Sequence, residues 1–263
     1  MLTVCKHELK LGFKTLLIWS LSVGLMGLLC ILLYTSMDGE MAEMADSFSN
    51  MGAFSDAFGM STLSIATISG FFATEVGTVH GLGSAMFAAI LAAVILSKEE
   101  DGHTGEFLYS LPVSRGSAVT AKCLSVLINL VAFTVICGLL YVLGFAMLGE
   151  EVPWKEMITF LARMLLMNVE VASLALVISA ASAKNRLGAG LGLALILYAY
   201  DLIGRVVPDL KDYLFVGPFS FANASEIFAG KETPAGAIIL ATVLIVTALA
   251  STYMIYLKKD LAS

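Results

Sequence analysis

Charged residues are scarce in this chain. Asp, Glu, Lys and Arg make up only 14% of its 263 residues, whereas hydrophobic residues make up 59%. This apolar content exceeds what the core of a soluble protein of this length usually contains, so we expect the lipid bilayer to be the solvent. The net charge of -6 argues against nucleic acid as a partner and does not identify a substrate.

Motifs for disulfide, nucleotide and nucleophile chemistry are also missing. Cys5, Cys30, Cys123 and Cys137 show no CxxC spacing and lie in or beside apolar segments, which argues against a disulfide framework. No GxxxxGK[ST] phosphate loop occurs, so if ATP drives this protein, another chain binds it. The sequence contains no HExxH or GxSxG motif either, and we expect no catalytic residue in it.

Six apolar segments are long enough to cross a membrane, since each crossing needs about 20 mainly apolar residues. We therefore expect an all-α fold, with one transmembrane domain over residues 1–263. An amphipathic helix over 1–15 would lie on the inner surface, and the stretch 206–235, rich in proline and aromatics, suits a re-entrant element. The apolar run 61–97 exceeds one crossing, and we place its earlier part outside the membrane. The expected spans are about 16–35, 76–96, 123–148, 158–181, 187–205 and 236–257.

The basic residues predict the orientation. Ten of them fall in segments that this assignment places inside and five in segments that it places outside, so the positive-inside rule puts both termini in the cytoplasm of what we take to be a bacterial cell. The inner set is Lys6, Lys10, Lys14, Lys98, Arg115, Lys122, Lys184, Arg186, Lys258 and Lys259. The outer set is Lys155, Arg163, Arg205, Lys211 and Lys231.

The polar segment 98–122 is the most informative feature, because it is the only sizeable inner loop. It begins with acidic residues around Gly102 and Gly105, and an apolar patch then precedes Pro112. A short amphipathic helix that ends near Pro112 would present this patch to a partner. The patch consists of Phe107, Leu108, Tyr109 and Leu111.

The string EEDGHTGEFLYSLPVSR, followed by small residues and Lys122, closely resembles a signature of ABC exporter permeases of the second export class, the ABC-2 type. In that family an acidic pair, a Gly-Thr-Glu-like step, a Leu-Pro-Val-Ser-Arg-like step and a lysine lie between the second and third spans. The matching residues here are Glu99, Glu100, Thr104, Gly105, Glu106, Leu111, Pro112, Val113, Ser114, Arg115 and Lys122. One departure is that glycine follows the threonine here instead of preceding it.

The resemblance implies that this segment is a coupling helix that docks on an ATPase subunit. It implies two permease protomers, identical or different, and two ATPase chains that bind ATP and Mg²⁺, while this chain binds no cofactor. The acidic residues would anchor docking and the apolar ones would fill a groove. The residues expected to couple are Glu99, Glu100, Gly102, Thr104, Gly105, Glu106, Phe107, Leu108, Leu111, Pro112 and Arg115. Drugs, peptides, lipid-linked molecules and ions all remain open as substrates.

Two other interpretations of this loop are an ordinary solvated connector and a metal site. The metal site would use Glu99, Asp101, His103 and Glu106. These ligands are hard carboxylates with a single imidazole, and solvated acidic loops are common, so we favour the coupling interpretation.

Ionisable groups inside spans cost on the order of 3 kcal/mol at the helix centre, so each needs an explanation. Glu170 lies deepest, two residues from Asn168, and both are candidates for the translocation path or a protomer contact. The alternative is a structural carboxylate that hydrogen-bonds a neighbouring helix. Asp201 precedes Arg205 by four residues, a spacing that lets the two pair on one helical face.

Two other functions follow from these groups. A secondary transporter would use Glu170 or Asp201 as an ion or proton relay. An intramembrane enzyme would use Glu75 and His80, but side chains five positions apart on a helix diverge in direction and make a poor catalytic pair.

Small residues recur at every fourth position of the second span. Such a stripe lets another helix approach closely. We favour packing within the chain over a seam between protomers. The stripe includes Gly77, Gly81, Ala85, Ala89 and Ala93.

Overall fold

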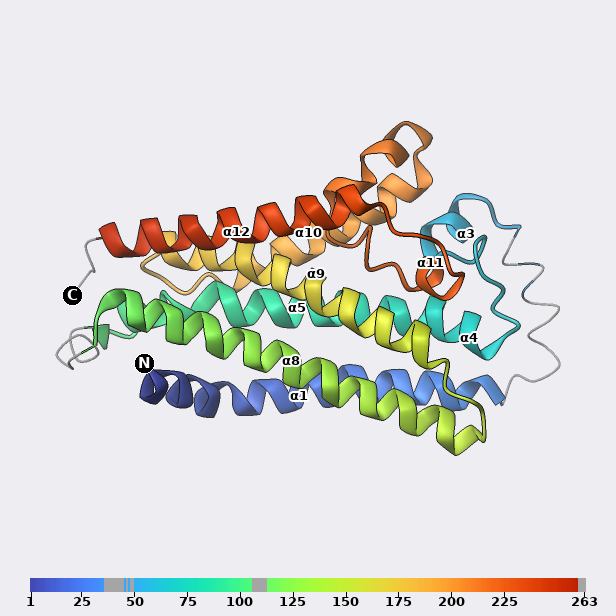
Figure 1. Ribbon diagram of the computed structural model, residues 1–263, viewed down its shortest axis with the longest axis horizontal. Helices are drawn as coiled ribbons and strands as arrows, with labels where there is room; N and C mark the ends of the chain where they lie inside the picture. Colours follow the sequence, from blue (N-terminus) through green and yellow to red (C-terminus); the bar gives the residue numbers. More distant parts are fainter. Residues whose placement is uncertain (36–44, 46, 48–49, 106–112, 260–263) are drawn as a thin grey trace.

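The computed structural model describes residues 1–35, 45, 47, 50–105 and 113–259. Within these ranges the chain is helical, contains no strand, and has six helical segments long and apolar enough to cross a membrane (Figure 1). The all-α, six-span prediction is confirmed. The segments are α1 (Leu2–Tyr34), a continuous unit over Ile68–Ile95, α8 (Arg115–Leu148), α9 (Trp154–Ala181), α10 (Leu187–Val206) and α12 (Ala235–Lys258).

The unit over Ile68–Ile95 comprises three pieces, which are α4 (Ile68–Phe71), the π-helical η2 (Phe72–Val76) and α5 (Gly77–Ile95). Both chain ends lie at one end of the bundle, which we call the terminal end (Figure 1). The short helix α6 (Lys98–Asp101) lies there too. At the opposite far end lie α3 (Ala53–Phe58), the 3₁₀ segment η3 (Pro208–Val216) and α11 (Ala224–Phe228).

The segment between α10 and α12 leaves the bundle and returns to it at the far end, as a re-entrant element would. Three of its aromatic side chains, Phe219, Phe221 and Phe228, pack into the bundle, whereas Tyr213 and Phe215 are exposed. Phe219 lies edge-on to Tyr198 with ring centroids 5.4 Å apart, and Phe228 packs against Phe72 of η2 at 5.3 Å. The segment therefore closes the far end of the helices.

Two spans begin earlier than the sequence predicts. α8 starts at Arg115 rather than 123, because Ser114 caps it by accepting a hydrogen bond from the Ser117 amide. Thr67 caps the second span in the same way, so its helix starts at Ile68 rather than 76. With 34 residues, α8 measures about 50 Å and so exceeds the hydrocarbon thickness. Apolar length marks only the part of a helix that lies in lipid.

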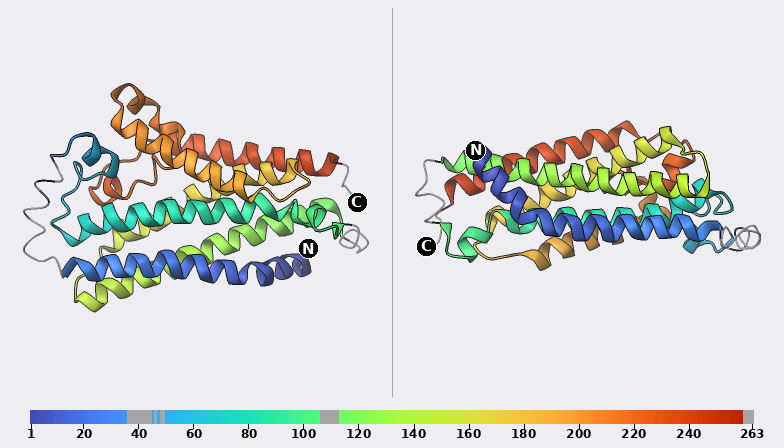
Figure 2. Two further views of the ribbon diagram at one scale, coloured as in Figure 1. Left: turned by 180° about the vertical axis from the view of Figure 1, so that it is seen from behind. Right: turned by 90° about the horizontal axis from the view of Figure 1, so that it is seen from below.

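The N-terminal fifteen residues are helical, as the sequence predicts, and lead into the first span without a break. They belong to α1, whose first turns tilt against the rest of the helix in the right-hand view of Figure 2. Val4 and Cys5 are buried in a small apolar cluster with Ala121 of α8. This burial holds the start of α1 on its neighbour.

The second and fourth spans form the centre of the bundle. Just over half of the apolar window of each is buried, against 22% for α10 and 17% for α12. Aromatic rings fill the space between them, as where Phe72 of η2 meets Phe160 of α9 edge-on with ring centroids 5.8 Å apart. Since α10 and α12 are the least covered helices, their outer faces meet lipid or another chain.

Gly27 of α1 lies at a close approach between helices and gives the first prediction. A Cβ atom there would collide with the Tyr141 ring and come within 2.9 Å of Val76 Cγ1. Tyr141 is fully buried and its hydroxyl is 2.8 Å from His80, so it has no room to yield. Gly27→Val should therefore destabilise the protein by about 1–3 kcal/mol, measured as a lower midpoint of thermal unfolding in detergent.

Gly188→Val is the matched control, because a Cβ at this α10 glycine meets nothing within 4 Å. The control should unfold at the wild-type midpoint. Equal midpoints for both variants would contradict this packing of α1.

Candidate functional site

Lys122 of α8 is fully buried at the terminal end, where α1, α5 and α8 meet. Its Nζ donates hydrogen bonds to the Ile95 carbonyl at 2.6 Å and to Glu99 Oε1, and it lies 3.1 Å from Glu8 Oε1. An ammonium group has three donors, and three acceptors surround this one. Burying an ion costs several kcal/mol, which such pairing offsets.

The pairing extends on both sides of Lys122. Glu8 also pairs with Lys98, and the buried Glu100 accepts from Lys259 Nζ at 2.7 Å. Lys259 Nζ further donates to the Ser182 carbonyl at 2.7 Å. We call Glu8, Lys98, Glu99, Glu100, Lys122 and Lys259 the ion cluster. Its three acidic and three basic residues balance in charge and join α1, α6, α8 and the end of α12.

The ion cluster holds both flanks of the 106–112 segment. Glu99 and Glu100 precede that segment and belong to the cluster. Arg115 follows it, and its Nη1 donates to the Lys259 carbonyl at 2.8 Å. The described residues on both sides of this segment are therefore tied to several helices of the bundle.

The turn after α6 accounts for the departure from the family signature. His103 has a φ of 53°, the left-handed conformation that glycine adopts most readily. The amides of His103 and Thr104 donate to the carbonyls of Glu100 and Glu99, at 3.2 and 2.8 Å, as in a Schellman helix end. When Thr104 is aligned with the threonine of the family signature, His103 aligns with the signature's glycine. Its backbone conformation is the one that glycine adopts most readily.

Two acidic residues of this segment pair with lysines of the same chain. Glu99 and Glu100 were expected to anchor docking on a partner, yet their carboxylates turn inward to Lys122 and Lys259. The two carboxylates would be too costly to bury if these lysines did not pair with them. Gly102 and Thr104 are exposed, and Gly105 is buried. Outside the described residues lie Glu106, Phe107, Leu108, Leu111 and Pro112.

Sequence reasoning missed the lysine partners and Glu8. One signal was present, because Glu8 is the only acidic residue in the first 37 positions and stands among basic residues. Lys98 and Lys259 gave no such signal, since lysines at the ends of spans are expected anyway.

Asn168 and Glu170 are buried in α9 and keep unpartnered polar atoms. Both amide atoms of Asn168 and Oε2 of Glu170 have no hydrogen-bond partner in the part of the chain that the structure describes. Two positions correspond to about 200° around a helix, so the two side chains point to opposite sides of α9 and do not form one site. Their part in a translocation path stays a prediction.

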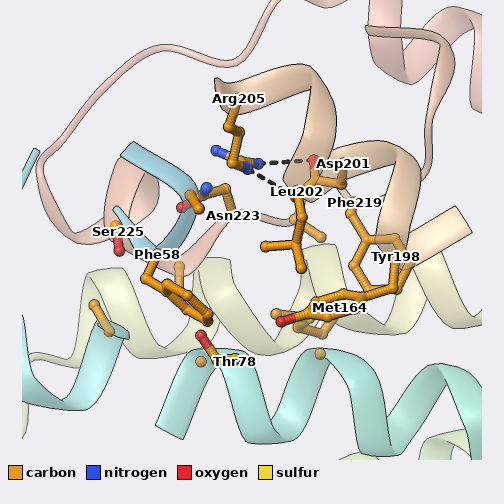
Figure 3. A pocket seen from close by; sticks show the side chains of 16 residues that line it. Phe58, Thr78, Met164, Tyr198, Asp201, Leu202, Arg205, Phe219, Asn223 and Ser225 are labelled. Atoms are coloured by element: carbon orange, nitrogen blue, oxygen red, sulfur yellow. Dashed lines mark hydrogen bonds and ion pairs between the residues drawn. The ribbon is translucent and has the colours of Figure 1, made fainter. Parts of the chain in front are cut away.

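Asp201 and Arg205 form a two-pronged ion pair near the far end. Arg205 Nε and Nη2 donate to the two carboxylate oxygens at 2.7 and 2.9 Å, and both residues are buried. The expected spacing therefore does produce a pair. Figure 3 shows the pair over a small pocket, across from Thr78 of α5. The pocket holds about 50 Å³, enough for water but not for a large substrate.

His80 belongs to the aromatic core. Its Nδ1 lies 2.8 Å from the Tyr141 hydroxyl, and the Phe133 and Phe160 rings pack around the imidazole. Among the described residues no hydrogen bond joins His80 to Glu75, and no group of three metal-ligating side chains occurs. The intramembrane-enzyme alternative gains no support from this geometry.

The small-residue stripe of the second span faces other helices of the same chain. Met164 Cε of α9 would lie 3.5 Å from a Cβ at Gly81, and Gly190 of α10 packs against Ala89 and Ala93. Ala85, Ala89 and Ala93 are fully buried, and Gly77 abuts Ala224 of the far-end segment.

These observations define a multi-pass helical membrane protein with a charged cluster under the loop between its second and third spans. The family model described as ABC-2 family transporter protein matches residues 2–261. The chain belongs to this family, and it is accordingly a membrane permease of the ABC exporter type. No curated protein matches it.

Removing the Lys122 charge should be strongly destabilising. Lys122→Met leaves Glu99 Oε1 buried without its partner, and breaking such a pair typically costs about 3–5 kcal/mol. The measurement is the midpoint of thermal unfolding of the purified protein. Lys10→Met, an exposed lysine of the same end, is the control and should not change it. Adding Glu99→Gln to Lys122→Met should recover part of the loss, and a midpoint equal to that of the control would contradict the assignment.

Asn168→Leu should raise stability, because an unpartnered buried amide costs about 1–3 kcal/mol and leucine fills a similar volume. Asn129→Leu is the matched control. Asn129 is also buried in a span, but its Nδ2 donates to the Ser125 carbonyl at 2.8 Å, so its removal brings no gain. Thermal unfolding of both variants tests this, and a loss of stability in Asn168→Leu would show that its amide has a partner.

Proposed function

We propose that this chain is the membrane subunit of an ATP-driven exporter that works as two protomers with two separate ATPase chains. The ATPases would bind ATP and Mg²⁺ and drive efflux of the substrate. The observation that carries this proposal is that the ion cluster anchors both flanks of the segment with the family signature.

Motion would pass from the ATPase to the bundle through this anchor. When the ATPases close, they would push the segment over 98–115, and the pairs of Glu99 with Lys122 and Glu100 with Lys259 would transmit the push. Ion pairs shielded from water hold their geometry better than solvated pairs, which suits a mechanical link. Long rigid helices such as α8 would then carry the motion to a path between the protomers.

Docking itself falls to the residues between the two flanks. Since Glu99 and Glu100 are committed to lysines of this chain, Glu106 is the carboxylate left to meet a basic residue of the ATPase. Phe107, Leu108 and Leu111 would fill an apolar groove. This arrangement requires the terminal end to face the cytoplasm, in agreement with the excess of basic residues there.

A secondary transporter with an Asp201 relay has less support. Both carboxylate oxygens of Asp201 already accept hydrogen bonds from Arg205, which makes this residue less suited to relay an ion. Glu170 alone would have to carry the ion. Flux driven by an ion gradient, without any ATPase, would favour that alternative.

The docking proposal predicts that Leu108→Asp abolishes both transport and ATPase stimulation, because a carboxylate would be buried in an apolar groove. The tagged chain is purified from native membranes, and partners are identified by mass spectrometry as chains with a phosphate loop. The complex is then reconstituted into vesicles. Leu2→Asp, at an exposed leucine of the same end, is the control.

Both variants should be expressed and inserted like the wild type. Unchanged ATP-dependent coupling in the Leu108→Asp vesicles would refute the docking role. A transport activity that persists without any phosphate-loop partner would refute the exporter assignment itself.

A further inference from the structure

The far end concentrates its positive charge in two cavities. The sequence assigns five basic residues to this side of the bundle, and every one of them lines one of two cavities there. Arg205 and Lys211 line the first, together with Asp212 and Glu226. Two bases and two acids balance in that cavity. The second cavity is different.

The second cavity holds about 140 Å³ between α9 and the stretch after α11. Three bases line it, Lys155, Arg163 and Lys231, but only one acid, Glu156, so its lining carries a net charge of +2. We call it the basic cavity. The chain as a whole carries -6, which makes this local excess of positive charge unusual.

The charged groups of the basic cavity are not neutralised by the chain itself. Over the described ranges, no salt bridge involves any of these four residues. Arg163 Nη1 donates to the Phe221 carbonyl at 3.3 Å, and Lys231 Nζ lies 3.4 Å from Thr62 Oγ1. A guanidinium has five N–H donors, so most of the donors of Arg163 stay available.

This pattern contrasts with three other bases of the chain that are buried or half-buried. A carboxylate forms an ion pair with each of Lys122, Lys259 and Arg205. The nitrogen–oxygen distance is 2.7 Å for Lys259 and for Arg205. Three like charges around one cavity repel each other, and an anion between them would relieve that repulsion. Arginine binds phosphate and carboxylate groups through paired N–H donors, with lysine adding point charge.

We propose that the basic cavity binds a phosphate group, either of a lipid headgroup or of a soluble phosphate ester. Its volume suits one such group, since a water molecule occupies about 30 Å³ of liquid. Arg163 provides the directional hydrogen bonds. Lys155 on α9 and Lys231 after α11 provide positive charge from the two sides of the cavity. The cavity would hold an anion beside the segment that closes the far end.

The first experiment titrates inorganic phosphate into the purified full chain in a maltoside detergent, which contains no phosphate, and measures binding by calorimetry. The double variant Arg163→Gln, Lys231→Gln should weaken binding by at least about tenfold, since it removes two of three charges. Lys211→Gln is the control, because Lys211 is a basic residue of the neighbouring cavity. It should bind like the wild type.

The second experiment identifies a lipid source by counting the phosphatidylglycerol molecules that stay bound in native mass spectrometry. Loss of one bound lipid in the double variant, but not in Lys211→Gln, assigns the site to a headgroup. Phosphate binding without lipid retention assigns it to a soluble anion. Both results support the proposal, and neither measurement needs an ATPase, so failure here is separate from failure of the exporter assignment.

Lys155→Gln guards against loss of fold, because Lys155 is exposed and its side chain forms no hydrogen bond or salt bridge to another described residue. It should weaken phosphate binding several-fold at an unchanged unfolding midpoint. The proposal is wrong if Lys155→Gln and the Arg163→Gln, Lys231→Gln double variant both bind phosphate and phosphatidylglycerol as the wild type does.

Discussion

The buried ammonium of Lys122 is the constraint on which the terminal end depends. An unpaired ion at that position would be prohibitively costly, so α1, the end of α5 and the start of α6 must bring their acceptors to the same point. This requirement sets how far α1 lies along α8, and it explains why the first turns of α1 are held on the bundle. Apolar packing alone would permit such helices to slide.

Buried polar groups occur at both ends of the bundle and in its middle. At the terminal end, and at Asp201 and Arg205, charges are paired, although Glu99 Oε2 and Glu100 Oε2 have no hydrogen-bond partner among the described residues. In the middle, Asn168 and Glu170 keep polar atoms without partners. Ionisable or polar groups left unpaired inside a membrane commonly mark a functional path.

Several features followed from the sequence because they are local. The number of spans follows from apolar length, since hydrocarbon thickness sets it. The pairing of Asp201 with Arg205 follows from a spacing of four on a helix, and the segment with Glu99, Glu100 and Lys122 was found by its resemblance to a family signature. Span starts were wrong where a cap, such as Ser114, begins a helix outside the lipid.

What only the tertiary structure decided is which distant groups meet. Glu100 and Lys259 stand 159 positions apart, and no periodicity connects them. The same holds for Glu8 with Lys122, and for Lys231 with the two bases of α9 that line the basic cavity. A helical pattern states which face of each helix is apolar, but the neighbour of that face depends on how all six helices pack. The sequence by itself therefore determined a six-span membrane protein and its signature loop, while the packing decided that two of the loop's carboxylates point inward.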